Sequence, residues 1–397
     1  MILHRRSALL LLASAALSPV APAHAAIEDA FARFLEEARQ AAAAAGISRE
    51  TIARETDGLT PDPKLLARPA AQGEFSLSPR EYLARLVDPG KVAAGRAQLG
   101  KQRAALDIVE RRTGVPREIV LAFWALESGF GGAQGDHDIL RSLATLGASG
   151  DRAALFRDEF VAALAILDRG EATRAQLKGS WAGAMGQPQF MPSSYLKYAV
   201  PLSGDGAADI WRSAGDSLAS IGNFMRLSGW SAGLPALVEV RVPESFDWRP
   251  VDLPFADWAR LGFATTGGHA LPSSGTGSLF LPAGAAGPAL LLTDNFEAIR
   301  AYNTSDAYAL AVFVLAERIA GRPGLVTQWP PDGPRLSAAQ RRAVQERLRA
   351  QGFYKGTVDG RFGRATRVAV HAWQVEAGWM PADGLATPAL LDRLGGS

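Results

Sequence analysis

The 397-residue sequence contains no cysteine. A lipid anchor on an N-terminal cysteine and structural disulfides are therefore excluded. A chain of this length can bury a sufficient hydrophobic core without covalent cross-links. The lack of disulfides therefore does not argue against export.

Histidine and long apolar runs are also scarce. Two of the five histidines, His4 and His24, lie among the first 25 residues, and no pair has the spacing of a zinc site. After residue 25, no segment approaches the roughly 20 apolar residues that cross a bilayer. The sequence therefore predicts no zinc site and no membrane anchor.

Residues 1–25 have the pattern of a cleavable export signal. A basic start at His4-Arg5-Arg6 precedes an apolar run from Ala8 to Val20, and Ala23-His24-Ala25 supplies a small-x-small cleavage site. A membrane anchor is less favoured because the run is short and interrupted by proline. We expect cleavage after Ala25 and a soluble protein in the periplasm.

Charge is unevenly divided along the chain. From Arg335 to the end there are ten Lys and Arg against five Asp and Glu, whereas residues 26–334 carry 30 against 35. A basic tail on an acidic body suggests that the tail docks on something anionic. An exported chain without a basic-aromatic motif is a poor candidate for binding nucleic acid, so an anionic cell-wall polymer is the better partner.

The composition, 48% hydrophobic and 21% charged, is typical of a packed globular protein of two or three domains. Apolar spacing predicts a mainly α (α+β) fold. A β-rich insert is expected at 235–292, where alternation and turn residues replace the helical pattern. Helices are predicted at 27–58, around Tyr82, and at 91–113, 116–127, 138–147, 153–169, 173–178, 214–228, 296–300, 307–319, 337–351, 365–377 and 387–394.

One predicted helix ends in a carboxylate. Residues from Ile119 to Leu126 are apolar on every face, which indicates a buried helix, and Glu127 follows them just before Gly129. Desolvation favours the protonated carboxyl and raises its pKa, as a general acid near neutral pH requires. These residues alone are equally compatible with a solvated glutamate before a glycine cap.

A second stretch, Gly179 to Tyr195, is rich in glycine and short polar side chains. Such a loop can approach a ligand closely and offer backbone N–H groups.

Three motifs make the chain similar to the lytic transglycosylase B family of exported bacterial enzymes: Trp124-Ala125-Leu126-Glu127-Ser128-Gly129-Phe130-Gly131, the loop from Ser180 to Tyr195, and Ala301-Tyr302-Asn303-Thr304-Ser305-Asp306-Ala307-Tyr308-Ala309. The resemblance runs from about Glu74 to Ala320 and implies a lysozyme-like helical domain. The tail from about Leu336 to Leu394 resembles the peptidoglycan-binding-1 module, a three-helix bundle, in a motif that includes Val344-Gln345, Gly352-Phe353-Tyr354, Val358-Asp359-Gly360, Trp373-Gln374 and Asp383-Gly384. The expected boundaries are signal 1–25, catalytic domain 26–320 with the insert 235–292, linker 321–335 and peptidoglycan-binding domain 336–394.

The resemblance implies a reaction and its residues. Such enzymes cut the MurNAc-(β1,4)-GlcNAc bond of peptidoglycan and leave 1,6-anhydro-MurNAc ends, with one catalytic acid and no second carboxylate as nucleophile. Glu127 matches that acid. The family's substrate-binding positions match Ser180, Gln189, Tyr302, Tyr308, Tyr82 and Asn303, with Tyr302 the tyrosine expected closest to the acid. Loop structure is the alternative role for Ser180 and Gln189, and packing is the alternative for Tyr82, Asn303 and Tyr308.

No cofactor and no metal are expected. Some family members hold calcium in a loop that matches residues 201–209 here, but Pro201 and Ala207 stand where ligands would be. Ser203, Asp205 and Asp216 could hold an ion only weakly. The expected partners are peptidoglycan glycan strands and proteins of cell-wall synthesis or turnover, and the chain is expected to be a monomer.

Two other functions remain open at this stage. A catalytically silent wall-binding scaffold would not need to retain Glu127, Ser180 and Gln189 together, which argues against it. A hydrolytic muramidase of the same fold would differ only in whether water or the C6 hydroxyl of MurNAc captures C1. The match to the family favours the anhydro product.

Overall fold

The computed structural model describes residues 21–67, 77–150, 152–204 and 206–395. The export signal expected at 1–25 lies largely outside these ranges, and helix α1 (Ala21–Ala44) runs through the expected cleavage point. Within these ranges there is no helix both long enough and apolar enough to cross a membrane.

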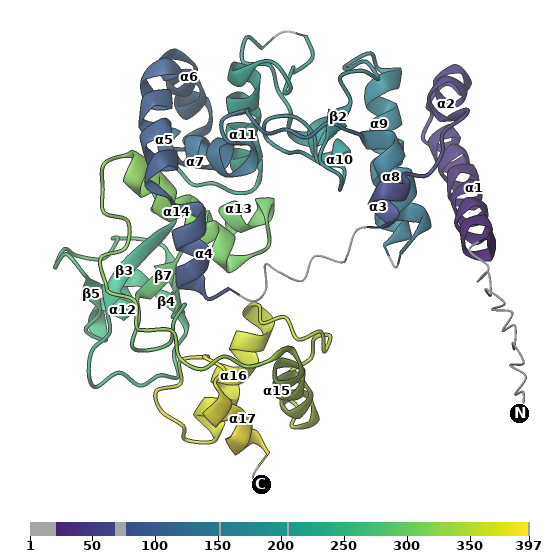
Figure 1. Ribbon diagram of the computed structural model, residues 1–397. Helices are drawn as coiled ribbons and strands as arrows, with labels where there is room; N and C mark the ends of the chain where they lie inside the picture. The colour runs from purple at the N-terminus through teal and green to yellow at the C-terminus, as the bar shows by residue number, and fades with distance from the viewer. Residues whose placement is uncertain (1–20, 68–76, 151, 205, 396–397) are drawn as a thin grey trace, which may run out of the picture.

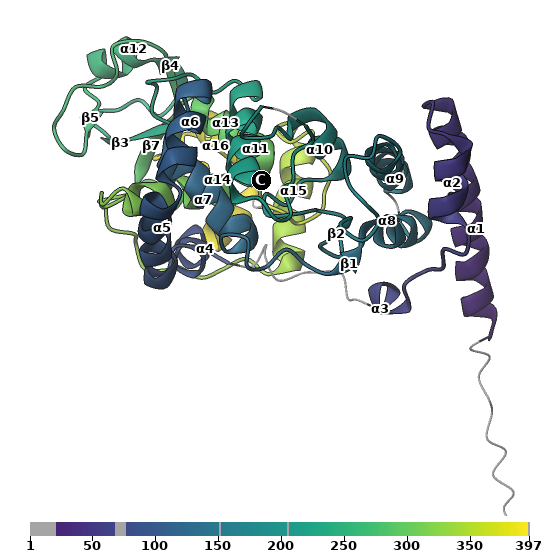
Figure 2. The same ribbon diagram turned by 90° about the horizontal axis from the view of Figure 1, so that it is seen from above.

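The body of the molecule is a helical assembly built around α7 (Arg117–Ser128), whose residues from Ile119 to Ala125 are buried. The other helices of the body are α2 (Arg49–Thr56), α3 (Pro63–Leu66), α4 (Pro79–Leu86), α5 (Pro89–Lys101), α6 (Arg103–Thr113), α8 (Ile139–Ala148), α9 (Ala153–Asp168), α10 (Pro192–Tyr198), α11 (Ala214–Leu227), α13 (Asp294–Tyr302) and α14 (Asp306–Ile319). Helix α7 packs on α5, α6, α11 and α14. Helices α1 and α2 lie at the opposite end of the body from the five-stranded sheet of the insert in both views (Figure 1, Figure 2).

Three predicted helices needed correction. The helix expected at 27–58 breaks at Gly46, which has φ +83°, and restarts after the N-cap Ser48. The helix expected at 91–113 divides at Gln102 into α5 and α6.

The helix predicted at 173–178 is reduced to a single turn, in which the Leu177 N–H donates to the Thr173 carbonyl at 3.0 Å. The Gln176 Oε1 atom accepts from the Thr173 N–H at 3.0 Å and from its hydroxyl at 2.8 Å, which favours a turn. The chain then enters β2 (Lys178–Gly179), which pairs antiparallel with β1 (His137–Asp138).

The predicted β-rich insert is a five-stranded antiparallel sheet in the order β4-β6-β7-β3-β5. It has its own apolar core, in which Phe255 and Trp258 of α12 (Phe255–Arg260) are buried. The strands are β3 (Leu237–Arg241), β4 (Asp252–Pro254), β5 (Ala264–Thr265), β6 (Thr276–Phe280) and β7 (Ala289–Leu292).

The C-terminal segment forms the three-helix bundle expected from the sequence, here called the tail module: α15 (Ala338–Ala350), α16 (Arg364–Glu376) and α17 (Pro388–Leu394). It has a separate hydrophobic core. A glutamine on α15 holds the turn that leads into α16, since Gln345 Oε1 accepts from the Gly360 N–H at 2.7 Å. Its Nε2 atom donates to the Asp359 carboxylate at 3.2 Å.

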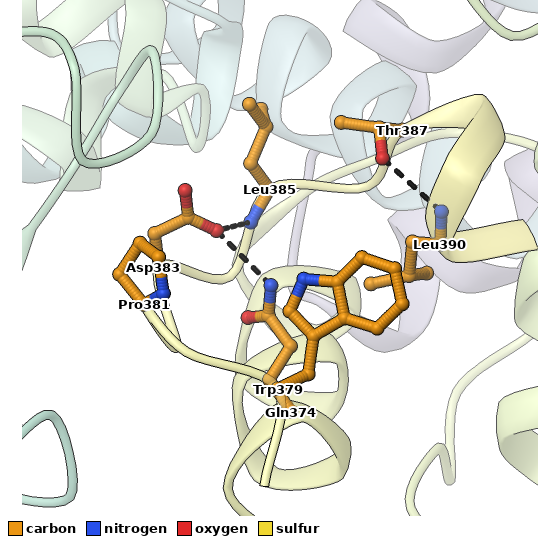
Figure 3. Close-up of a pocket in the computed structure, with 7 residues that line it drawn as sticks. All are labelled: Gln374, Trp379, Pro381, Asp383, Leu385, Thr387 and Leu390. Atoms are coloured by element: carbon orange, nitrogen blue, oxygen red, sulfur yellow. Dashed lines mark hydrogen bonds between the residues drawn. The ribbon is translucent and has the colours of Figure 1, made fainter. Parts of the chain in front are cut away.

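The same arrangement recurs one helix later. Gln374 of α16 accepts from the Gly384 N–H at 2.8 Å and donates to the Asp383 carboxylate at 3.1 Å, just before α17. These groups border a small pocket of about 90 Å³ with Trp379 beside it (Figure 3). Because the Gln374 amide and the Asp383 carboxylate hydrogen-bond to each other and to the backbone, this part of the module's motif serves the fold.

Candidate active site

Glu127 lies at the carboxyl end of α7, where the helix stops abruptly. Gly129 takes φ +58° and its N–H donates to Ala125, while the Phe130 N–H donates to the Trp124 carbonyl at 3.1 Å. This left-handed cap satisfies the last carbonyls of the helix. The apolar helix therefore delivers a carboxylate to a partly buried position at its end.

Burial governs the ionisation of Glu127. Desolvation raises the pKa of its carboxyl from 4.5 to about 7, and the hydrogen bond that the Tyr308 hydroxyl donates to its Oε1 atom opposes this rise. Burial also raises the pKa of Tyr308 and of Tyr302 well above 10. At neutral pH both phenols are hydroxyl donors, and Glu127 exchanges its proton readily.

The two motif tyrosines have different roles. Tyr302 was expected closest to the acid, but its hydroxyl donates to the Pro188 carbonyl, and the acid's partner is Tyr308. The Tyr302 ring packs 4.7 Å from that of Phe123 and 4.6 Å from that of Phe224. Tyr302 therefore joins α7, α11 and the 180–195 loop.

The loop residues Ser180 and Gln189 are partly buried and both have polar atoms to spare. Ser180 Oγ accepts from the Ala184 N–H at 3.0 Å, which leaves its hydroxyl proton to donate. Gln189 Nε2 donates to the carbonyls of Gln134 at 3.1 Å and Gly186 at 2.8 Å, which leaves Oε1 as an acceptor. Gln189 has φ +52°, a conformation that is uncommon outside glycine and concentrates at functional sites.

Tyr82 and Asn303 lie at the margin of this group. Tyr82 of α4 packs partly buried against the main core and lies close enough to Tyr308 to raise the pKa of that phenol. Asn303 is exposed between α13 and α14, and its Oδ1 atom accepts from the Ser305 N–H at 3.2 Å. Asn303 therefore shapes this turn.

Gln187 is a supporting residue that the sequence did not single out. Its buried amide accepts from the Trp124 indole N–H at 2.9 Å and donates to the Trp211 carbonyl at 3.2 Å. Gly131 approaches it so closely that a Cβ atom would lie 2.7 Å from Gln187 Oε1. The Glu127 helix and the 180–195 loop are thus held together, and Gly131, the last residue of the Trp124–Gly131 motif, is the sequence signal for this contact.

A pocket of about 630 Å³ lies between α3 and the start of α8. His137 is one of the residues that line this pocket. It pairs with Gly179 across the β1–β2 ribbon, and Gly179 directly precedes Ser180 in the chain. The lining residues are Asp62, Pro63, Lys64, Leu65, Asp136, His137, Asp138 and Arg141.

The loop that was compared with a calcium site is closed by protein contacts. Both carboxylate oxygens of Asp216 accept backbone N–H groups, from Leu202 at 3.0 Å and from Asp209 at 2.9 Å. Asp205 lies outside the described residues. Among the residues that the structure describes, no three His, Asp or Glu side chains gather as a metal site would need. The Asp216 side chain holds the loop together through its backbone contacts.

Comparisons with known proteins agree with this geometry. The family model described as "Transglycosylase SLT domain" matches residues 30–317, and the one described as "Putative peptidoglycan binding domain" matches residues 337–394. The first covers well over half of the chain. The protein therefore belongs to the SLT-domain transglycosylases, and it is a lytic transglycosylase with a C-terminal peptidoglycan-binding module.

Within that family, the chain is similar along most of its length to SltB3 from Pseudomonas aeruginosa, solved in complex with NAG-anhNAM-pentapeptide. The two are 42% identical, with a TM-score of 0.84 over 92% of this chain and 99% of that one. Membrane-bound lytic murein transglycosylase B of Escherichia coli (strain K12) is 31% identical over 245 residues, 60% of this chain and 66% of that protein. Lytic transglycosylase Slt35 of Escherichia coli, solved with calcium, is 28% identical, with a TM-score of 0.61 over 73% of this chain and 92% of that one.

Proposed function

We propose that this protein cleaves the MurNAc-(β1,4)-GlcNAc bond of peptidoglycan without water and leaves 1,6-anhydro-MurNAc ends. The observation that carries the proposal is a single desolvated carboxyl, Glu127, with a pKa of about 7 and a phenol donor on one oxygen. One group with this pKa can serve first as an acid and then as a base. SltB3, the similar solved protein, binds a saccharide named as anhNAM.

In the first step, protonated Glu127 gives its proton to the oxygen that joins MurNAc C1 to GlcNAc C4. The C1–O bond breaks, GlcNAc leaves with a free 4-hydroxyl, and positive charge develops at C1. The acetamido group of the same MurNAc assists at C1, and we assign the Ser180 hydroxyl, which has its proton free to donate, to hold it. The Tyr308 hydroxyl stabilises the new carboxylate through its hydrogen bond to Oε1.

In the second step, the Glu127 carboxylate takes the proton of the MurNAc C6 hydroxyl, and O6 bonds to C1. The acid is regenerated, and the product lacks the elements of one water relative to a hydrolysed end. We assign saccharide binding to Gln189, Tyr302, Tyr82 and Asn303 around this centre. The substrate is a glycan strand of the wall, so the protein acts in the periplasm after removal of residues 1–25.

The test of the acid is Glu127→Gln. The amide keeps the shape of the side chain but cannot deliver a proton, so turnover falls by roughly a thousandfold or more. Binding to purified sacculi stays near normal, since the substrate-binding side chains remain. Glu118→Gln, the same substitution in the first turn of α7, is the matched control and should leave turnover unchanged. Substantial activity in Glu127→Gln would show that the acid lies elsewhere.

We propose that turnover needs no metal ion, because the carboxylate oxygens of Asp216 already bind backbone N–H groups. Treatment with a chelator should leave both turnover and the melting temperature unchanged. Loss of either, restored by added calcium, would contradict this.

A further inference from the structure

One face of helix α16 in the tail module lies against the catalytic body. Arg364, Arg367 and His371 are spaced to share that face, and each contacts the body. Arg364 lies 2.8 Å from Glu297 Oε1 and 3.4 Å from Asp306 Oδ1. The His371 Nε2 atom lies 2.7 Å from the Trp248 carbonyl in the insert. Part of the module's basic surplus is therefore used within the chain.

The middle residue of this face is deeply inserted. The Arg367 guanidinium lies 4.5 Å from the centre of the Phe280 ring and donates to the Leu281 carbonyl at 3.4 Å. Burial lowers the pKa of Arg367. Nearby, Asp383 of the module accepts from the Ala285 N–H of the body at 3.1 Å. These contacts fix the module in one place on the body.

Arg364 enters an ion network at the junction of α13 and α14. The Asp306 side chain is only 9% exposed and lies 2.6 Å from Arg300 Nε, besides its contact with Arg364. Arg300 also donates to Glu297 at 2.7 Å and to the Thr304 carbonyl at 3.1 Å. Asp306 is the first residue of α14, so the network fixes where that helix begins.

The beginning of α14 leads directly to the catalytic carboxyl. Tyr308 follows Asp306 by two residues, and its N–H donates to Ser305 Oγ at 3.3 Å in the helix cap. The Tyr308 hydroxyl donates to Glu127. Two side-chain contacts, Arg364 with Asp306 and Tyr308 with Glu127, joined by the first turn of α14, therefore connect the tail module to the acid.

We propose that Arg364 is a positioning residue for the catalytic centre: by holding Asp306 it fixes the first turn of α14 and keeps the Tyr308 hydroxyl on Glu127. The tail module thereby completes the active site of the body as well as contributing to substrate retention. This inference rests on the proposed role of Glu127.

The ionisable groups around this path are few. Tyr308 acts on Glu127, the Glu127 charge raises the pKa of Tyr302, and Tyr82 acts on Tyr308. Arg300 and Arg364 contact Asp306, Glu297 binds both of these arginines, and the Arg367 cation is close enough to interact with Asp306 and Arg364. Removing the Arg364 cation therefore alters the acid only through the position of Tyr308.

The test is the pH dependence of kcat/KM on a short soluble muropeptide, for which wall retention does not matter. In Arg364→Ala we expect kcat to fall about tenfold with KM nearly unchanged, and the basic limb of the profile to move to higher pH. The limb moves this way because loss of the Tyr308 hydrogen bond removes the contact that lowers the pKa of Glu127. Arg364→Lys should recover part of the activity.

Three further variants keep the test decisive. Asp306→Asn removes the same contact from the body's side and should shift the limb in the same direction. Arg349→Ala, an exposed arginine on α15, is the matched control and should match the wild type. Adding Tyr308→Phe to Arg364→Ala should cause little further change, because both act through one hydrogen bond.

An unmoved basic limb in both Arg364→Ala and Asp306→Asn would overturn the inference, whatever happens to KM. If Glu127→Gln is inactive in the same assay, only the positioning role fails. If Glu127→Gln retains activity, the proposed function itself fails.

Discussion

At the scale of single residues, the chemistry depends on the balance between desolvation and one hydrogen bond at Glu127. Burial raises the pKa of the carboxyl to about 7, and Tyr308 restrains that rise. The reaction needs the protonated form first and the carboxylate afterwards. A pKa near the working pH serves both roles.

Removing the phenol hydroxyl tests this balance. In Tyr308→Phe the carboxylate loses its donor, so the pKa of Glu127 rises and the basic limb of kcat/KM moves to higher pH. A hydrogen bond to a charged group contributes about 1.5–3 kcal/mol, so kcat should fall roughly tenfold or more. Steady-state kinetics across the pH range measure both effects, and Tyr302→Phe should leave the limb in place.

The same desolvation should be visible in stability. The folded pKa of about 7 exceeds the ordinary value of 4.5, so burying Glu127 costs nothing below pH 4.5 and costs most above pH 7. Glu127→Gln should therefore be about 3 kcal/mol more stable than the wild type at pH 8, with almost no such gain at pH 4. Urea unfolding of both proteins at the two pH values measures the difference. An equal gain at both would show that Glu127 is not desolvated.

At the scale of elements, the end of α7 is the critical feature. Its left-handed cap aims Glu127, and Gly131 then passes against Gln187, which holds Trp124 of the same helix. The sequence predicted the apolar helix, its carboxylate and the glycine stop. The Gln187 contact was not predictable, because it joins two segments that only the tertiary fold brings together.

Two glycine variants separate the cap from the close approach. In Gly129→Ala the added Cβ meets nothing within 4 Å, so only the left-handed backbone is strained. The free energy of unfolding should therefore fall by about 1 kcal/mol. In Gly131→Ala the Cβ would also clash with Gln187 and disturb its hydrogen bond to Trp124. The free energy of unfolding should then fall by about 2–3 kcal/mol in total. Denaturant unfolding shows which variant loses more stability. Equal losses in the two variants would contradict the role given to Gln187.

The errors in the predicted elements have a common cause. Helical composition continues through residues 27–58 and 173–178, but Gly46 and the Thr173–Gln176 side-chain contact break the helix locally. Similarly, the resemblance predicted Tyr302 as the tyrosine closest to the acid, whereas the hydroxyl that bonds to Glu127 is that of Tyr308. Local patterns identify the residues, and long-range packing assigns their partners.

At the scale of the whole molecule, the tail module is docked on the body. The excess of basic residues predicted a module directed at an anionic polymer, yet Arg364 and Arg367 contact the body instead. The net charge of a module does not show which of its charged side chains already contact other parts of the same chain. Other basic side chains bond within the module: Arg341 donates to the Gly360 carbonyl at 2.7 Å and Arg347 to the Leu391 carbonyl at 2.6 Å.

Release of the module is the corresponding prediction. Arg364→Ala with Arg367→Ala removes an ion pair and a buried cation–π contact, so the module should separate from the body. Small-angle X-ray scattering should show a larger radius of gyration, and calorimetry a second unfolding transition. Arg349→Ala should change neither. An unchanged radius in the double variant would show that other contacts hold the module.

The central claim is that the C6 hydroxyl of MurNAc, and not water, captures C1. Mass spectrometry of the muropeptides released from purified peptidoglycan tests it most directly. The account predicts products that end in 1,6-anhydro-MurNAc, each one water lighter than a reducing end. Hydrated reducing ends would keep Glu127 as the acid but make the enzyme a muramidase and contradict the claim.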